Sequence, residues 1–252
     1  MSDRLLEAVC QLAKDAGELV LQVYRSDFEV LDKDDGSPVT LADRLAEDCI
    51  LEGLGRISPG VPVVAEEAIA AGHRPQVGDV FWLVDPLDGT REFVSRNGEF
   101  TVNIALIESG RPRLGVVLAP ALGCLFAGGR AGQVAFREMA GTRVPIRARP
   151  APPEGITVIA SRAHGDAQAL DAFLSNRKVA AMLQAGSSLK LCRIAEGAAD
   201  LYPRFGRTME WDIAAGQAVL EAAGGRVETL DGAALGYGKP DFENPHFVAC
   251  GV

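Results

Sequence analysis

The strongest structural signal in this sequence is an apolar segment that runs directly into two acids. Residues 82–90 read Trp-Leu-Val-Asp-Pro-Leu-Asp-Gly-Thr. The apolar part predicts a buried strand that stops at Asp85-Pro86, because proline has no N–H for the next rung of a sheet. Asp85 and Asp88 would then emerge at one sheet edge. Gly89 lets a ligand approach the backbone, and Thr90 can open a helix whose free N–H groups attract phosphate. The segment therefore suits a divalent metal held against a phosphate.

The composition limits the partners of this chain. Its 252 residues are 48% hydrophobic, enough for a large core in one domain or two lobes. The formal net charge is −9, which argues against binding of a nucleic-acid polymer, because that requires many phosphate-neutralising Lys and Arg residues. An anionic substrate would need cations placed locally, from a metal or from a few basic side chains.

Cysteine usage and hydropathy bear on the compartment. The five cysteines are an odd number without a CxxC pair, which predicts reduced core thiols in a cytoplasmic protein. Residues 1–14 lack the apolar region of a signal peptide, and no apolar stretch reaches the roughly 18 residues of a membrane span. We expect a cytoplasmic location and leave peripheral association with the inner membrane open.

Hydrophobic periodicity predicts two helices near the start of the chain, over residues 3–25 and 40–56. Thr40 is a suitable N-cap for the second helix, with Asp43 three residues later. The predicted apolar face of this helix consists of Leu41, Leu45, Cys49, Ile50 and Leu54.

The pattern then changes to strands. Short strands are predicted over residues 61–65, which end at Glu66-Glu67, and over 81–84. An antiparallel meander follows, with strands over 100–107, 114–118, 124–127 and 133–136, and with turns at Ser109-Gly110 and Gly128-Gly129.

A proline-rich link over residues 149–153 precedes an alternation of strands and helices. We therefore expect two lobes, an N-terminal α+β lobe over 1–153 and a C-terminal α/β lobe over 154–252. The strands expected after the link span 156–160, 179–183, 201–202, 226–228 and 246–249, and the helices 167–174, 187–196 and 211–223, the last closed by Gly224-Gly225.

Acids recur at strand ends and helix starts in four segments. They are Asp43, Glu66-Glu67, the pair Asp85 and Asp88, and Asp212. Ligands that are rich in oxygen and poor in sulfur and histidine indicate a hard cation, Mg²⁺ or Mn²⁺ rather than zinc. Each piece alone has an ordinary explanation as a cap, a turn or a solvated acid; the combination and its order are specific.

Over nearly its whole length, the chain resembles the inositol monophosphatase superfamily of Mg²⁺-dependent, lithium-sensitive phosphatases. The resemblance rests on Ser-Pro-Val-Thr-Leu-Ala-Asp at 37–43, Ala-Glu-Glu at 65–67, Asp-Pro-Leu-Asp-Gly-Thr at 85–90 and Glu-Trp-Asp-Ile-Ala-Ala-Gly at 210–216. It implies an α/β (α+β) layered αβαβα sandwich of the sugar-phosphatase type, with the active site between the lobes.

The resemblance also implies roles for individual residues. Glu66, Asp85 and the Leu87 carbonyl would hold a first metal, and Asp85, Asp88 and Asp212 a second. Glu67 would act through a water on a third, weaker metal. The implied cofactor is two or three Mg²⁺ ions, with Mn²⁺ able to substitute. Asp43, Thr90 and Glu66 form the implied catalytic set, and Asp43 and Thr90 activate water. The backbone N–H groups of Gly89 and Thr90 would bind phosphate oxygens, and the implied substrate-binding residues also include Leu87, Asp88 and Asp212.

Segments of the second lobe narrow the implied substrate. Residues 160–164, 186–190 and 202–205, together with 93–105 from the first lobe, look like the 3'(2'),5'-bisphosphate nucleotidase branch, the CysQ type. That branch implies that His164, Ser187, Lys190 and Arg204 contact a small phosphorylated nucleotide and its second phosphate. Two basic groups away from the metals suit a substrate with two phosphates. The implied reaction converts adenosine 3',5'-bisphosphate (PAP) to AMP and phosphate, which in bacteria would clear a by-product of sulfate assimilation.

Two alternatives stay open. The first is another phosphatase on the same scaffold, acting on inositol 1-phosphate, histidinol phosphate or fructose 1,6-bisphosphate. The second is a nucleotide-binding or Mg²⁺-binding regulator without turnover, against which the intact pair Asp43 and Thr90 argues. A monomer and a homodimer are equally compatible with the sequence, as are PAPS and 2',5'-isomers as further substrates.

Overall fold

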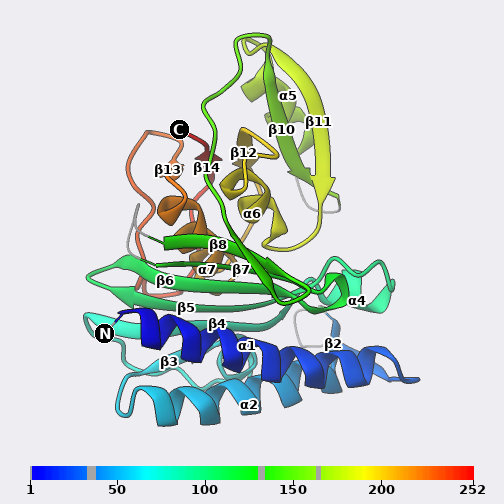
Figure 1. Ribbon diagram of the computed structural model, residues 1–252, viewed down its shortest axis with the longest axis vertical. Coiled ribbons are helices and arrows are strands. Elements are labelled where there is room, and N and C mark those ends of the chain that lie inside the picture. The colour runs from blue at the N-terminus through cyan, green and yellow to red at the C-terminus, as the bar shows by residue number, and fades with distance from the viewer. Residues whose placement is uncertain (1, 33–37, 130–133, 163–165) are drawn as a thin grey trace.

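The molecule is built from alternating layers of helices and sheets, as Figure 1 shows. The computed structural model describes residues 2–32, 38–129, 134–162 and 166–252. Helices α1 (Ser2–Tyr24) and α2 (Leu41–Ile57) cover one face of a seven-stranded sheet. Helices α6 (Leu189–Ala195) and α7 (Glu210–Ala222) separate that sheet from a five-stranded one. With α5 (Ala167–Leu174) at the outer end, this order confirms the expected αβαβα sandwich.

The strands of the seven-stranded sheet lie side by side in chain order. β3 and β4 are parallel, and every later pair is antiparallel, so the predicted meander is confirmed. A last strand, β9, was not predicted. The strands are β3 (Val63–Ala65), β4 (Val80–Asp88), β5 (Thr101–Glu108), β6 (Arg111–Ala119), β7 (Cys124–Gly129), β8 (Val134–Met139) and β9 (Thr142–Pro145).

The acidic end of β4 differs from the prediction. The strand does not stop at Asp85-Pro86 but continues to Asp88. Its register against β5 shifts at this point, since Asp85 pairs with Asn103 and Asp88 pairs with Thr101. The irregularity accommodates Pro86, which has no N–H to donate to a regular ladder. Both aspartates are thereby held by a strand of the sheet rather than by a loop.

Helix α7 packs so closely on the first sheet that two strand positions have room only for glycine. A Cβ atom at Gly115 would lie 2.4 Å from the Ala215 carbonyl oxygen, and one at Gly128 would lie 2.7 Å from Val219 Cα. The prediction of a turn at Gly128-Gly129 is therefore wrong, because both residues belong to β7 and Gly128 lies beneath the helix. Gly115 and Gly128 allow the layers to approach closely. In a sequence, a glycine with this role looks the same as a glycine that marks a turn.

The buried face of α2 agrees with the prediction at Ile50 and Leu54 and differs from it at the start of the helix. Leu41 is 58% exposed and Leu45 is 36% exposed. The helix instead buries small residues on the face turned toward α1, where Gly53 receives the side chain of Leu12. The buried set of α2 is Ala42, Asp43, Ala46, Glu47, Ile50, Gly53 and Leu54, and it contains two acids.

The five-stranded sheet has the order β11-β10-β12-β14-β13 and contains both parallel and antiparallel pairs. Its elements match the predicted alternation of strands and helices after the proline-rich link. The strands are β10 (Ile156–Ser161), β11 (Val179–Ala185), β12 (Leu201–Arg204), β13 (Arg226–Thr229) and β14 (Phe247–Cys250).

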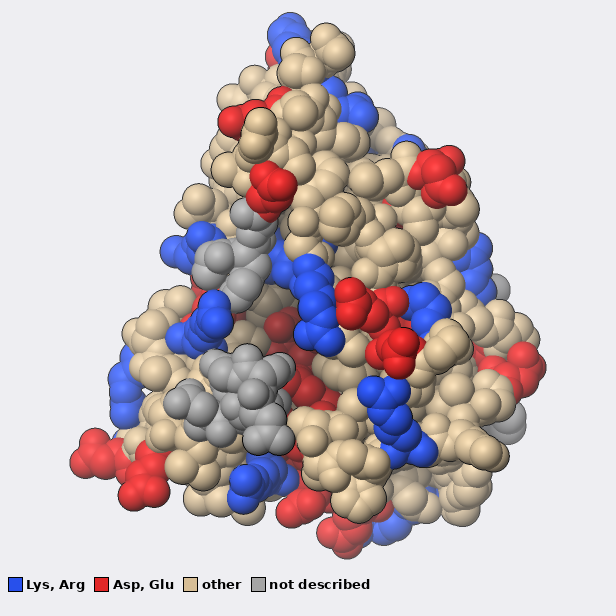
Figure 2. All heavy atoms as spheres, turned by 180° about the vertical axis from the view of Figure 1, so that it is seen from behind, with Lys and Arg blue, Asp and Glu red and all other residues tan. Residues whose placement is uncertain are grey.

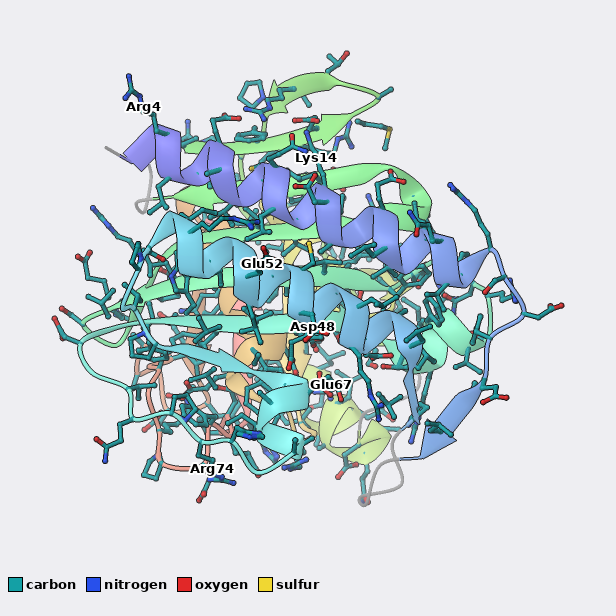
Figure 3. All side chains as sticks on the ribbon, turned by 90° about the horizontal axis from the view of Figure 1, so that it is seen from below. Arg4, Lys14, Asp48, Glu52, Glu67 and Arg74 are labelled. Atoms are coloured by element: carbon teal, nitrogen blue, oxygen red, sulfur yellow. The ribbon has the colours of Figure 1, made fainter. Side chains whose placement is uncertain are left out.

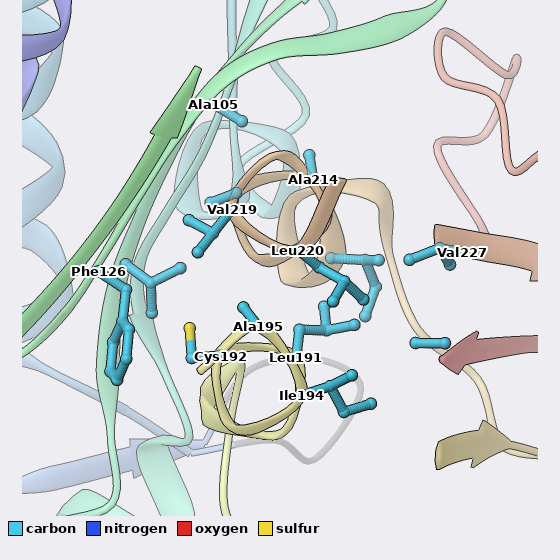
Figure 4. Close-up of a cluster of buried hydrophobic side chains, with 14 of the residues drawn as sticks. Ala105, Phe126, Leu191, Cys192, Ile194, Ala195, Ala214, Val219, Leu220 and Val227 are labelled. Atoms are coloured by element: carbon cyan, nitrogen blue, oxygen red, sulfur yellow. The ribbon is translucent and has the colours of Figure 1, made fainter. Parts of the chain in front are cut away.

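One hydrophobic cluster joins the two sheets through α6 and α7. Figure 4 shows Leu191 and Ile194 of α6 beside Leu220 of α7, with Phe126 of β7 on one side and Val227 of β13 on the other. Burial of such side chains contributes roughly 1.5–3 kcal/mol each. The division into lobes at residue 153 stays a prediction, but residues from both proposed lobes share this core.

Among the described residues, no helix combines the length and apolarity needed to cross a bilayer. Five short elements complete the described chain. They are β1 (Val30–Asp32), β2 (Pro38–Thr40), α3 (Glu66–Ala70), α4 (Thr90–Val94) and a 3₁₀ turn (Pro120–Leu122).

Candidate active site

A cavity of about 700 Å³ lies where the acidic end of β4 meets α7 and β12. Figure 2 shows acidic atoms inside the central hollow of this face and basic side chains around it. Most of the predicted site residues line this cavity: Glu66, Asp85, Leu87, Asp88, Gly89, Thr90, Ser187, Lys190, Arg204 and Asp212.

The carboxylates in the cavity repel one another. Burial and the charges of Glu66, Asp88 and Asp212 raise the pKa of Asp85 well above its usual value. Burial, with repulsion from Asp88 and Glu66, likewise raises the pKa of Asp212. Burial also raises the pKa of Asp88, although the nearby Lys190 opposes this shift. Such a group of acids is stable in its charged form only beside compensating positive charge.

Asp85, Asp88 and Asp212 of this cluster each have a protein donor. The Leu87 N–H donates to Asp85 Oδ1 at 3.0 Å, and the Met209 N–H donates to Asp212 Oδ2 at 2.8 Å. Ser188 Oγ lies 3.0 Å from Asp88 Oδ2. Within the described ranges, no three His, Cys, Asp or Glu side chains close into a ready metal-ligand set. The donor chemistry still fits a hard cation, because the carboxylates of the cluster line this cavity and no His or Cys side chain stands among its described lining residues.

Thr90 and Asp43 meet beside the cluster. Thr90 Oγ1 lies 3.4 Å from Asp43 Oδ1 and 3.3 Å from the Leu87 carbonyl oxygen. Asp43 is buried at the start of α2, where its Oδ2 accepts hydrogen bonds from the Thr40 N–H at 2.7 Å and from Thr40 Oγ1 at 2.8 Å. The predicted N-cap thus also fixes the carboxylate that faces Thr90.

Glu66 and Glu67 begin the short helix α3 beside α2, and Figure 3 labels Glu67 there. The Glu67 N–H donates to Glu47 Oε2 at 2.8 Å. Glu47 is 5% exposed, and burial raises its pKa to about 7. Sequence reasoning did not select Glu47. It lies one helical turn after Asp43, so a second acid on the same face of the predicted helix is the signal that could have found it.

Basic groups line the same cavity. Lys190 Nζ donates to the Ser187 carbonyl oxygen at 2.5 Å and lies 5.5 Å from the centre of the Tyr202 ring. Burial lowers the Lys190 pKa to about 8, against the opposing effect of Asp88. Arg204 is 9% exposed, and its Nη2 donates to the Arg207 carbonyl oxygen at 2.9 Å. The cavity therefore offers positive charge as well as carboxylates.

Three predicted site residues do not line the cavity. Asp43 and Glu67 lie behind its wall, where they contact Thr90 and Glu47. His164 lies outside the described residues. Ser188 and Asn103 were not selected from the sequence, yet Asn103 Nδ2 donates to Ser188 Oγ at 2.9 Å beside Asp88. A polar Asn103 inside an apolar strand was the available signal.

Comparison with known proteins defines the class of this molecule. The family model described as "Inositol monophosphatase family" matches residues 1–251. The chain is 46% identical over 246 residues to the 3'(2'),5'-bisphosphate nucleotidase CysQ of Escherichia coli K12, with 96% of this chain and 98% of that protein covered. It is 48% identical over the same length to the CysQ of Salmonella typhimurium LT2.

Solved structures agree with these matches. CysQ from Bacteroides thetaiotaomicron, described as a bacterial member of the inositol monophosphatase family, superposes with a TM-score of 0.81 at 34% identity, over 99% of this chain and 97% of that one. The Thermotoga maritima IMPase superposes with a TM-score of 0.78 at 27% identity, over 98% and 92% of the two chains. The chain belongs to the inositol monophosphatase family. Within that family, the chain is similar to CysQ proteins along nearly their whole length.

Proposed function

We propose that this protein is a metal-dependent phosphatase that removes the 3'-phosphate of PAP to give AMP and phosphate. The observation that carries the proposal is a single cavity lined both by mutually repelling carboxylates and by Lys190 and Arg204. The similarity to proteins named 3'(2'),5'-bisphosphate nucleotidase supports the same substrate class.

The carboxylates fit a hard divalent cation. We infer Mg²⁺, with Mn²⁺ able to substitute, because the group offers only oxygen ligands and because burial, together with the neighbouring carboxylates, raises the pKa values of Asp85 and Asp212. A bound cation would supply positive charge to the phosphoryl oxygens and make an attacking water more acidic. The proposed ligands are Glu66, Asp85 and the Leu87 carbonyl for one ion, Asp85, Asp88 and Asp212 for another, and Glu67 for a third.

The protein's own groups position the reacting phosphate and the water. The N–H groups of Gly89 and Thr90 would donate to phosphate oxygens, which stabilises the charge that develops on them. Thr90 Oγ1 can donate its proton to Asp43 while its lone pairs accept one from water. Thr90 thus orients the water. As the water attacks, its proton passes to Thr90 Oγ1, and the Thr90 proton passes to Asp43.

The second phosphate requires cations of its own. Lys190 and Arg204 line the cavity and would bind it, since a planar guanidinium and an ammonium both recognise phosphate. Ser187 and His164 are the further proposed nucleotide contacts. A substrate with one phosphate would not use both basic groups.

Phosphate release by the purified protein tests this function. PAP, AMP, inositol 1-phosphate and fructose 1,6-bisphosphate are compared with Mg²⁺, each with and without lithium or EDTA. We expect PAP to be preferred, with activity lost on chelation and reduced by lithium. A preference for a sugar phosphate would replace the substrate assignment and leave the proposed metal chemistry intact.

A matched pair of substitutions tests the carboxylate cluster. Asp85→Asn removes a central charge of the proposed metal site and should abolish phosphate release. Asp48→Asn makes the same chemical change at an exposed position of α2, which Figure 3 labels, and should leave phosphate release unchanged. Phosphate release that persists in Asp85→Asn protein would contradict the proposed mechanism.

A further inference from the structure

Glu99 connects the first sheet to the substrate side of the cavity. It lies between α4 and β5, and its N–H donates to Asn97 Oδ1 at 2.9 Å, which fixes the backbone locally. Its side chain is 23% exposed and reaches two segments that follow residue 153 in the chain. Glu99 is therefore a bridge between the proposed lobes.

The Glu99 carboxylate bonds the ends of two neighbouring strands. Arg162 follows β10 and donates to both carboxylate oxygens, from Nη2 at 2.8 Å and from Nε at 3.2 Å. Gly186 follows β11, and its N–H donates to Glu99 Oε2 at 2.8 Å. Since β10 and β11 pair in parallel up to Ser161 and Ala185, one carboxylate holds both strand ends together.

The turn at Gly186-Ser187 fits tightly against this bridge. A Cβ atom at Gly186 would lie 2.7 Å from the Glu99 carbonyl oxygen and 2.9 Å from Glu92 Cγ, so only glycine fits. Ser187 adopts a φ of 44°, which a non-glycine residue rarely adopts. Such a conformation persists only where its surroundings hold it.

The same turn carries groups that face the substrate. Ser187 lines the cavity, and its buried Oγ has no hydrogen-bond partner among the described residues. The Ser187 carbonyl oxygen also accepts the bond from Lys190 Nζ. The position of the turn therefore determines where the Ser187 hydroxyl and the Lys190 ammonium lie.

We propose that Glu99 is a positioning residue for specificity: by bonding Gly186 and Arg162, it holds the Gly186-Ser187 turn where Ser187 and Lys190 bind the second phosphate of the substrate. The proposal rests on the proposed function, since it assumes a substrate with two phosphates. Glu99 does not line the cavity, so it acts through the turn rather than by touching the substrate.

The test is the ratio of kcat/KM for PAP to kcat/KM for a small phosphomonoester, p-nitrophenyl phosphate, measured with Mg²⁺. Glu99→Ala should lower this ratio on the order of tenfold, mainly through a higher KM for PAP, because hydrogen bonds to a charged group are lost. Glu99→Gln should give an intermediate ratio, since its amide oxygen can still accept from Gly186 but its NH₂ group opposes Arg162.

The control is Glu108→Ala, at the other end of β5. Glu108 forms an ion pair with Arg113 at 3.0 Å and does not line the cavity, so both rate constants should be unchanged. If Glu99→Ala lowers the thermal unfolding temperature strongly, Arg162→Met replaces it. That variant leaves the Gly186 bond in place and should shift the ratio in the same direction by a smaller factor.

The outcomes separate this proposal from the proposed function. A wild-type protein that prefers PAP, with the same ratio in the folded Glu99 and Arg162 variants, would overturn only the role of Glu99. Equal losses for both substrates would also overturn it, because specificity would not have changed. A wild-type protein that does not hydrolyse PAP would overturn the proposed function, and the role of Glu99 with it.

Discussion

At the scale of single residues, the contact between Thr90 and Asp43 has a clear chemical consequence. Replacement of Thr90 by valine keeps the shape of the side chain but removes the hydroxyl that lies 3.4 Å from Asp43 Oδ1. We expect kcat to fall about 10²-fold or more, as for loss of a positioned proton-transfer group, with a smaller effect on KM. Thr90→Ser retains the hydroxyl and should retain most of the activity. Equal kcat values for the valine and serine variants would contradict the role of Thr90.

Lys190 predicts a pH dependence of substrate binding. Its pKa is lowered to about 8 by burial, so the ammonium loses its charge as the pH rises through that value. The KM for PAP should therefore increase above about pH 8, while it stays nearly constant for a substrate with one phosphate. Lys190→Arg keeps a positive charge throughout this range and should flatten the KM profile. A profile that is unchanged by this substitution would show that another group titrates.

At the scale of elements, α7 couples the packing of the first sheet to the active site. The helix carries Asp212 at its start and rests on Gly115 of β6, where a Cβ atom would lie 2.4 Å from the Ala215 carbonyl oxygen. Gly115→Ala should destabilise the fold by about 1–3 kcal/mol, because the helix must move away from the sheet. The same movement should displace Asp212 and lower the activity.

Gly55 in α2 supplies the matched control for Gly115. A Cβ atom there would meet no other atom within 4 Å. Gly55→Ala should be neutral or stabilising by up to about 1 kcal/mol, because alanine restricts the unfolded chain and favours a helix. Urea unfolding of the two variants measures both effects, and a similar loss in both would argue against tight packing under α7.

At the scale of the whole molecule, the carboxylate cluster predicts how metal and pH affect stability. The folded-state pKa values of Asp85 and Asp212 are raised well above their usual value of 3.8. Their contribution to stability is therefore fully present below that pH and is lost as the pH rises through the raised values. Metal-free protein should then carry an electrostatic penalty at neutral pH, which a cation would relieve.

Urea unfolding at pH 5 and pH 7.5, with EDTA or with Mg²⁺, measures this penalty. At a Mg²⁺ concentration of 100 times Kd, we expect about 2.7 kcal/mol of added stability at pH 7.5. Asp85→Asn should be more stable than the wild type in EDTA at pH 7.5 and should gain little from Mg²⁺. A wild type that gains nothing from Mg²⁺ would contradict the proposed cation site.

The sequence by itself determined the features that depend on short-range interactions. A run of apolar residues, a proline, a glycine and a capping pair act within a few positions, so the strand that leads to Asp85, the capped start of α2 at Thr40 and the helix with Asp212 were all predictable. The alternation after residue 153 was predictable for the same reason.

Only the tertiary structure decided which residues meet across long separations in the chain. The face that α2 buries depends on α1, and Gly128 lies within a strand that packs closely against α7. Glu99 and Gly186 form a hydrogen bond although they lie 87 residues apart. Local propensity carries no information on such contacts, because they depend on how the layers pack and on which buried polar groups find partners there.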